Sequence, residues 1–278
     1  MNRKIDKKVV GYRTQDGAGV QLVRVLSRRS AEDFDPILML DSFDSTNPED
    51  YMKGFPFHPH RGIETISYLR SGAMTHEDHL GNTSTVRDGG IQWMTAGSGI
   101  IHQEMPEPAE RMLGVQVWLN MKSSEKMDDP AYYDIPNSEI EEIQFEGGYL
   151  RVMAGSYKDV QGFSSGHHPL DFYSLNLELE TEYTLETDPN KAVILFTLEG
   201  EVEVAGEKIE EKTAVVTSEG DSLTIKSLGK PAEVLVLSSE RLKEAIAWGG
   251  PIVMNTKEEL LHAFDELDRG TFIKVEAK

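Results

Sequence analysis

The fold class is decided by the stretch Ala192-Val193-Ile194-Leu195-Phe196-Thr197-Leu198 and by the alternating Glu201-Val202-Glu203-Val204 that follows it. A short apolar run bounded by turn residues is typical of a buried strand, and strict alternation is typical of a half-buried one. Similar segments recur at intervals of about 8–12 residues. They cover residues 20–26, 63–69, 114–119, 149–154, 172–179, 214–216, 222–225 and 233–237. We therefore predict an all-β fold of antiparallel sandwiches or barrels.

The chain is long enough for two domains. It has 278 residues, and domains usually hold roughly 100–200 residues each. Residues 135–147 resemble a linker, because Ile135-Pro136-Asn137-Ser138 is followed by an acidic run and then by glycines. We predict two jelly-roll-type antiparallel barrels in tandem, over residues 1–140 and 141–278.

Helix is expected in two places only. The segment from Asn255 to Leu267 has apolar residues at helical spacing, and Thr256 followed by Glu259 fits a capping box. Gly270 can end this helix. Residues 123–127 are expected to form at most one turn. The second domain should therefore end in a short helical tail.

Composition and charge exclude several classes of function. The formal net charge of −20 repels phosphate backbones, so direct nucleic-acid binding is not expected. Without cysteine there can be no disulfide, thiolate nucleophile or iron–sulfur cluster. The charged N-terminus is followed by no apolar segment, and no stretch approaches the roughly 20 apolar residues of a membrane helix. We expect a cytoplasmic protein, or a nuclear one if the source is eukaryotic, with no membrane partner.

The histidines point to a metal site in the first half of the chain. His58 and His60 form a His-x-His pair, and His102 and Glu104 form a His-x-Glu pair. On a strand, residues i and i+2 project from the same face, so each pair offers two converging ligands. Three imidazoles and one carboxylate suit Fe, Mn, Ni, Cu or Zn, and they do not suit Ca or Mg. A lone His-x-His is weak, and the second pair strengthens the interpretation.

Glu64 competes with Glu104 for the place of the fourth ligand. It lies four residues after His60, about 13 Å along an unbent strand, whereas Glu104 is two residues from a candidate histidine. We favour Glu104 as the ligand. Glu64 would then orient an imidazole N–H from outside the ligand sphere, or simply be a polar residue of the barrel.

The remaining histidines are expected to have other roles. His76 and Asp78 share a strand face, so a hydrogen bond between them is expected near the barrel rim. For His79 we expect a structural or exposed role in preference to ligation. The pair His167-His168 lies beside a proline and is expected at the surface.

The run from Phe55 to Pro106 resembles the pirin family of the cupin superfamily. The similarity rests on the segments His58-Pro59-His60-Arg61-Gly62-Ile63-Glu64-Thr65 and Gln92-Trp93-Met94-Thr95-Ala96-Gly97, and on His102-Gln103-Glu104-Met105-Pro106. The segment Gly250 to Thr256 resembles the same family. One departure is Asp88-Gly89-Gly90, where the family more often has Pro-Gly-Asp.

The resemblance implies a bicupin fold with one mononuclear divalent metal, usually iron, in the N-terminal barrel. The family's ligands correspond to His58, His60, His102 and Glu104. The C-terminal barrel generally lacks metal in such proteins, and residues 172–237 of this chain contain no histidine. Manganese, nickel, copper and zinc remain compatible with the same donors.

The resemblance also implies two functions that differ in kind. One is a quercetin 2,3-dioxygenase, in which a flavonol chelates the metal, Glu104 takes the hydroxyl proton and dioxygen opens the ring. The other is a non-enzymatic regulator that binds partner proteins and responds to the redox state of the metal. A sugar or small-acid isomerase is a weaker third alternative, because the cupin barrel carries many chemistries.

Four apolar residues flank the candidate ligands and could form the wall of a substrate pocket. They are Phe57, Trp93, Met94 and Met105. Each one taken singly is as well explained as ordinary barrel core.

Overall fold

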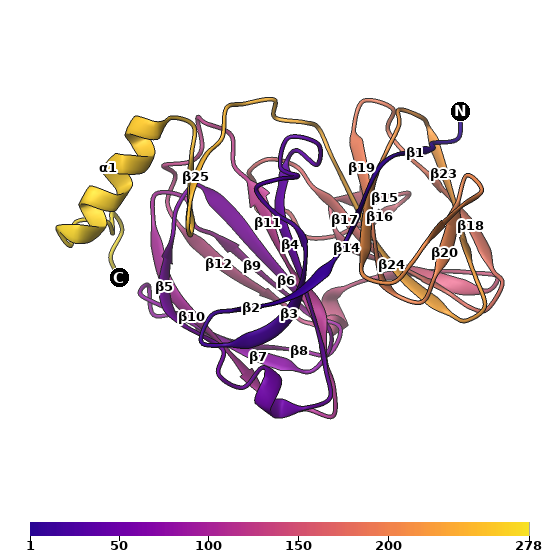
Figure 1. The fold of residues 1–278 in the computed structure, drawn as a ribbon, viewed down its shortest axis with the longest axis horizontal. Coiled ribbons are helices and arrows are strands. Elements are labelled where there is room, and N and C mark those ends of the chain that lie inside the picture. Colours follow the sequence, from indigo (N-terminus) through magenta and orange to yellow (C-terminus); the bar gives the residue numbers. More distant parts are fainter. Residues whose placement is uncertain (278) are drawn as a thin grey trace. The chain divides into compact units, whose positions relative to one another are not determined.

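A computed structural model describes residues 1–277, and it is built almost entirely from antiparallel strands (Figure 1). The chain packs as two units, each discontinuous in sequence. The unit that we call the first barrel comprises Arg13–Arg24, Ile37–Asn137 and Leu242–Lys278. The second barrel comprises Met1–Tyr12, Val25–Pro36 and Ser138–Arg241. The all-β class with two antiparallel units, expected from the sequence, is confirmed.

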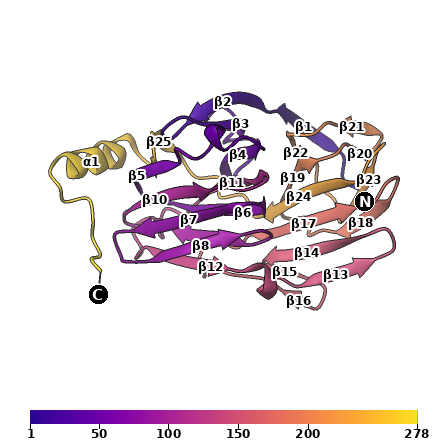
Figure 2. The same cartoon turned by 90° about the horizontal axis from the view of Figure 1, so that it is seen from below.

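The first barrel has two main sheets. Its larger sheet has the order β12-β9-β6-β11-β4-β3-β2, and its smaller sheet the order β5-β10-β7-β8 (Figure 2). The strands of the larger sheet are β2 (Tyr12–Asp16), β3 (Val20–Leu26), β4 (Ile37–Ser45), β6 (Ile63–Ser71), β9 (Ile91–Thr95), β11 (Met112–Asn120) and β12 (Ala131–Ile135). Those of the smaller sheet are β5 (Phe55–His60), β7 (Ala73–Asp78), β8 (Thr83–Arg87) and β10 (Ile100–Glu107).

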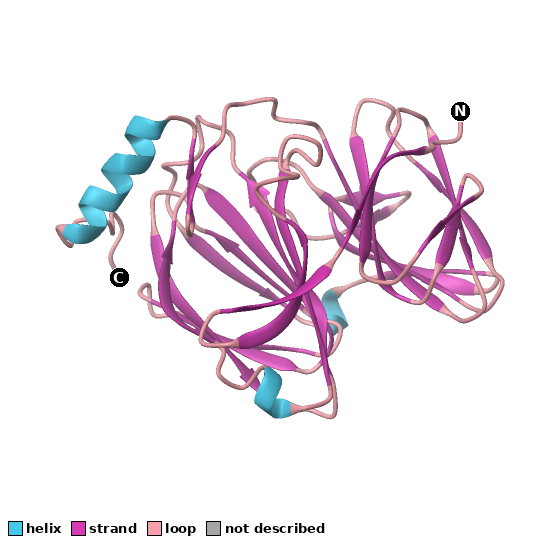
Figure 3. Ribbon diagram, viewed as in Figure 1, coloured by secondary structure: helices cyan, strands magenta, loops and turns pink. Residues whose placement is uncertain are grey.

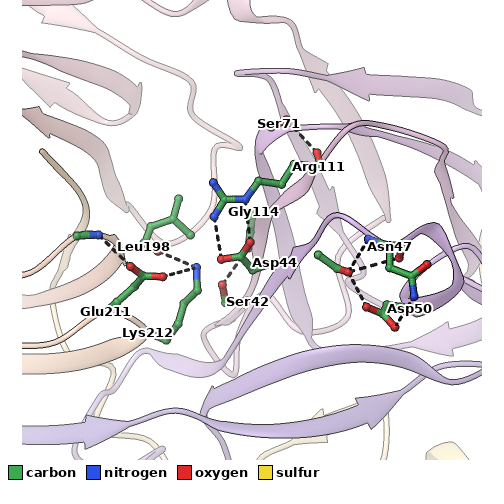
Figure 4. Close-up of polar contacts among 12 residues, drawn as sticks. Ser42, Asp44, Asn47, Asp50, Ser71, Arg111, Gly114, Leu198, Glu211 and Lys212 are labelled. Carbon is green, nitrogen blue, oxygen red and sulfur yellow. Dashed lines mark hydrogen bonds and ion pairs between the residues drawn. The ribbon is translucent and has the colours of Figure 1, made fainter. Parts of the chain in front are cut away.

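The pairing of β4 with β11 is tied at one end by side chains. Arg111 donates from Nε to Oδ1 of Asp44 at 2.9 Å and from Nη2 to Oδ2 at 3.0 Å (Figure 4). Ser42 donates from Oγ to the carbonyl oxygen of Gly114 at 3.3 Å. A bidentate arginine–carboxylate pair adds direction as well as attraction, and here it joins two neighbouring strands near their ends.

The second barrel repeats the two-sheet plan. Its larger sheet has the order β1-β22-β19-β24-β17-β14-β13. These strands are β1 (Ile5–Val10), β13 (Glu142–Phe145), β14 (Gly148–Ala154), β17 (Asp171–Leu177), β19 (Ala192–Glu199), β22 (Thr213–Thr217) and β24 (Ala232–Ser239). The smaller sheet consists of β18 (Glu182–Glu186), β23 (Ser222–Ser227), β20 (Val202–Val204) and β21 (Glu207–Ile209), and a hairpin joins β15 (Ser156–Tyr157) to β16 (Val160–Gln161). Val193, Leu195, Val215 and Val234 belong to its fully buried core.

The packing units differ from the sequence-based limits of 1–140 and 141–278 at both ends of the chain. The first strand, β1, pairs in antiparallel fashion with β22, so residues near the N-terminus belong to the second barrel. The C-terminal segment from Leu242 onward packs with the first barrel. The first exchange depends on strand pairing between distant residues, and the second includes an isolated β-bridge between Arg61 and Ile252. A scan for linkers detects neither contact.

The C-terminal segment contains β25 (Ala247–Gly249), β26 (Ile252–Met254) and the one α-helix of the described residues, α1 (Lys257–Asp268), drawn in cyan in Figure 3. Thr256 caps this helix and forms the capping box with Glu259 that the sequence predicts. Residues 123–127 form turns, and single 3-10 turns occur at Pro48–Asp50 and Asn137–Glu139. No helix among residues 1–277 is long and apolar enough to cross a membrane.

Candidate metal centre

Three histidines from two paired strands converge inside the first barrel. In the antiparallel pairing of β5 with β10, His102 lies opposite His58 and Ile100 lies opposite His60. One ligand nitrogen from each of the three imidazoles lies within 4.8 Å of the others. His60 and His102 are buried, whereas His58 is half-buried. The two-residue spacing of His58 and His60, together with the register of β5 against β10, therefore places three ligands around one point.

The hydrogen bonds of the rings show which nitrogens are free to bind a metal. Nδ1 of His58 lies 2.8 Å from the carbonyl oxygen of Pro56, and Nδ1 of His60 lies 3.0 Å from that of Pro251. A carbonyl oxygen only accepts, so each Nδ1 must carry the hydrogen. In the neutral rings each Nε2 therefore presents a lone pair.

These lone pairs fit a metal ion better than they fit one another. The Nε2 atoms of His58 and His60 lie 3.0 Å apart, and two lone pairs at that distance repel. Nε2 of His102 is buried without a hydrogen-bond partner. A buried polar atom without a partner is costly, and a cation shared by the three nitrogens would satisfy them all. The donor set therefore fits a transition metal.

Burial keeps two of these rings neutral. Desolvation, followed by the charges of nearby histidines, lowers the pKa of His60 to about 3. The same causes lower the pKa of His102 well below its ordinary value. Only neutral imidazole binds metal, so these two rings are ready to act as ligands at neutral pH.

Glu104 lies on the same face of β10 as His102, and both residues are buried. Its Oε1 accepts a hydrogen bond from Oγ of Ser67 at 3.2 Å, and its Oε2 accepts one from Nε2 of Gln116 at 2.6 Å. The cluster of close ligand atoms comprises the three histidines, and the Glu104 carboxylate is held beside it by these two donors. Ligation by Glu104 stays a prediction.

Glu64 has a different environment. Its Oε1 accepts a hydrogen bond from Oγ1 of Thr95 at 2.7 Å. The neighbouring residue Thr65 pairs with Trp118, whose ring contacts His60, and alternation directs Glu64 to the other face of β6. The orienting role considered for Glu64 is therefore carried, for His60, by the carbonyl of Pro251.

The four predicted pocket residues do not share one face. Met94 pairs with Thr65, so it lies on the histidine side of the larger sheet, and Trp93 projects from the opposite side. Met105 likewise alternates with Glu104 on β10. Phe57 is 53% exposed and alternates with His58. Of the four, Met94 has the position that best suits a pocket wall.

A further aromatic residue, Trp118, lines the centre, and Trp248 packs on it. The rings of Trp118 and His60 meet edge to face with centroids 5.0 Å apart, and the ring centroids of Trp118 and Trp248 are 5.7 Å apart. Sequence reasoning missed both tryptophans and Pro251. Pro251 lies within the Gly250–Thr256 segment that carried part of the family resemblance, and this was the available signal.

The other histidines take structural positions. Nε2 of His76 lies 2.8 Å from Oδ2 of Asp78, which confirms the predicted hydrogen bond. His79 accepts from the backbone N–H of Ile101 and donates to the carbonyl of Val275, in agreement with a structural role. His168 is buried in the second barrel, so the expectation that it lies at the surface is wrong.

The chain is similar to known proteins along most of its length. The family model described as Pirin matches residues 19–119, and the model described as Pirin C-terminal cupin domain matches residues 172–273. A pirin-like protein of Caulobacter vibrioides is 38% identical over 97% of this chain and 99% of its own. Human pirin is 33% identical, over 94% and 91%. A crystal structure of quercetin 2,3-dioxygenase from Acinetobacter baumannii is 32% identical and superposes with a TM-score of 0.90, covering 98% of this chain and 99% of that one.

Proposed function

The chain belongs to the pirin family, and on that premise we propose that it is a metal-dependent dioxygenase of quercetin-like flavonols. The observation that carries the proposal is the convergence of His58, His60 and His102 on one point. Their Nε2 lone pairs face one another there without a hydrogen-bond donor among the described residues. The structural relative named quercetin 2,3-dioxygenase supports the choice of substrate. The metal we propose is iron, and Mn, Ni, Cu and Zn suit the same donors.

A bound metal would supply Lewis acidity toward the 3-hydroxyl and 4-carbonyl oxygens of the flavonol and electron-transfer chemistry toward dioxygen. The three histidines would hold it through Nε2, with Glu104 as the fourth ligand. The carbonyls of Pro56 and Pro251 keep two of the rings in the required tautomer.

In this proposal Glu104 also acts as the base. A carboxylate accepts hydrogen bonds only, and Ser67 and Gln116 each donate one to Glu104, which fixes the direction of its side chain. Each carboxylate oxygen keeps a further lone pair for the 3-hydroxyl proton of the flavonol. Removing that proton makes the ring system electron-rich enough to react with dioxygen and to release carbon monoxide as the ring opens.

The second candidate is a regulator that acts through partner proteins. It is favoured by the contacts of the centre with the C-terminal segment, because His60 donates to Pro251 and His79 donates to Val275. A change at the metal would therefore reach Pro251 through His60, and Val275 through His79, which accepts from the backbone N–H of Ile101 beside His102. In that case the metal would alter a binding surface, and flavonol turnover would be negligible.

Oxygen uptake and carbon monoxide release with quercetin distinguish the two candidates. We expect turnover to need the metal and to fall by about 10²–10⁴-fold in Glu104→Gln, which removes the base and keeps an oxygen. The turnover of Glu104→Asp should lie between those of the wild type and Glu104→Gln, because this substitution shortens the side chain and keeps the carboxylate. Glu107→Gln, on the alternate face of the same strand, is the matched control and should keep its rate. No turnover in iron-loaded protein, or no ordered loss across the variants, would reject the enzyme.

A further inference from the structure

A buried pair of polar residues lies directly beside His102. In the pairing of β7 with β10, Asp78 lies opposite His102 and His76 lies opposite Glu104. His76 is 1% exposed and Asp78 is 5% exposed. Such groups are costly to bury unless their hydrogen bonds are complete, so the destination of each bond is informative.

Asp78 is held as a fixed acceptor. Its Oδ1 accepts from the backbone N–H groups of Leu80 at 3.0 Å and Asn82 at 3.1 Å. Its Oδ2 accepts from Nδ2 of Asn82 at 2.9 Å and from Nε2 of His76 at 2.8 Å. These bonds hold the pKa of Asp78 below its usual value against the effect of burial. Since the carboxylate can only accept, Nε2 of His76 carries a hydrogen.

The hydrogen on Nε2 of His76 decides the state of the next ring. Neutral His76 presents a lone pair at Nδ1, which lies 3.3 Å from Nδ1 of His102. His102 then donates from Nδ1, and its Nε2 keeps the lone pair that has no partner within the described structure. The Tyr132 ring stacks on His76 with centroids 3.9 Å apart at 11°, which fixes the plane of the relaying ring.

We propose that Asp78 and His76 are positioning residues for the metal, and that they hold His102 in its ligating tautomer through two consecutive hydrogen bonds. His58 and His60 obtain the same control from backbone carbonyls, and His102 obtains it from side chains. A relay that ends in a carboxylate also increases the donor strength of Nε2. The inference rests on the metal centre of the proposed function, and it does not depend on which reaction the metal supports.

The bonds around Asp78 make Asp78→Asn a sharp test. The two backbone N–H groups keep an oxygen at the Oδ1 position, so the amide nitrogen must occupy the Oδ2 position. There it faces His76 and the side-chain amide of Asn82, which can rotate to present its oxygen as an acceptor. His76 would then accept at Nε2 and carry its hydrogen on Nδ1. His102 would in turn accept at Nδ1 and carry its hydrogen on Nε2, the atom that must bind the metal.

The experiment measures Co(II) affinity by competition with a chelator, together with the visible absorption spectrum of the Co(II) protein. We expect Asp78→Asn to weaken binding by about 10–100-fold, as loss of such a partner usually does, and to alter the spectrum. His76→Phe keeps a ring stacked on Tyr132 but has no acceptor for His102. Its Co(II) affinity should fall by as much as that of Asp78→Asn. His76→Asn has no ring but keeps an acceptor at the δ position, so it should bind more tightly than His76→Phe.

Glu77→Gln is the matched control, because it removes a charge from the exposed face of the same strand and should leave affinity and spectrum unchanged. Wild-type affinity and spectrum in Asp78→Asn and His76→Phe would overturn the proposal. Tighter Co(II) binding by His76→Phe than by His76→Asn would also overturn it. That order would mean that packing of the ring on Tyr132, and not an acceptor at the δ position, sets the affinity. The Co(II) affinity is measured without substrate. If the variants show the expected order of affinities but the protein does not turn over quercetin, only the flavonol reaction is rejected.

Discussion

Acidification should destabilise the metal-free protein through its buried histidines. His60 is neutral in the folded chain down to about pH 3, whereas in the unfolded chain its pKa returns to about 6.5. Below pH 6.5 the unfolded state therefore binds one more proton than the folded state, and stability falls until about pH 3. Between pH 7 and pH 5 the free energy of unfolding therefore falls by about 2 kcal/mol through this residue alone.

The assay is urea unfolding of chelator-treated protein at both pH values, followed by tryptophan fluorescence. Trp93, Trp118 and Trp248 all belong to the first barrel, so the signal reports on the unit that contains His60. In His60→Asn the loss of unfolding free energy between pH 7 and pH 5 should be about 2 kcal/mol smaller than in the wild type. Equal losses in His60→Asn and wild type would refute the reasoning.

Three further predictions concern stability and binding. Arg61 donates to the carbonyls of Ser98 and Phe272 and to Glu266, so Arg61→Met should cost about 3–5 kcal/mol in urea unfolding, and a cost below about 1 kcal/mol would contradict this. Leu195→Ala in the core of the second barrel should cost about 2–5 kcal/mol by circular dichroism, and a neutral result would show that the site collapses without a cavity. The net charge of −20 predicts no retention of duplex DNA in a mobility-shift assay at physiological salt, and tight retention would revive nucleic-acid binding.

The histidine cluster could be predicted from sequence because strand geometry is simple. A spacing of two residues places both side chains on one face, so His58 with His60, and His102 with its neighbour Glu104, could be proposed as pairs without knowing the fold. What spacing alone could not supply is the register of β5 against β10, which brings the two pairs together. The family resemblance supplied that step as an expectation.

The supporting residues could not be predicted, because their roles depend on distant contacts of ordinary groups. The carbonyl of Pro251 is a generic acceptor that becomes specific only when the C-terminal segment reaches His60. Ser67 and Gln116 are unremarkable polar residues until the larger sheet directs them at Glu104. The bond between His76 and Asp78 followed from local spacing, and its continuation to His102 required the pairing of β7 with β10.

The central claim is that three histidines of the first barrel hold one metal ion. Its most direct test is the metal content of desalted protein after exposure of the chelator-treated chain to excess Fe(II) under anaerobic conditions. We predict one ion per chain, its loss in His60→Ala and His102→Ala, and its retention in His167→Ala, which lies in the second barrel. Two tightly bound ions per chain, none in the wild type, or one ion retained by His102→Ala would contradict the account.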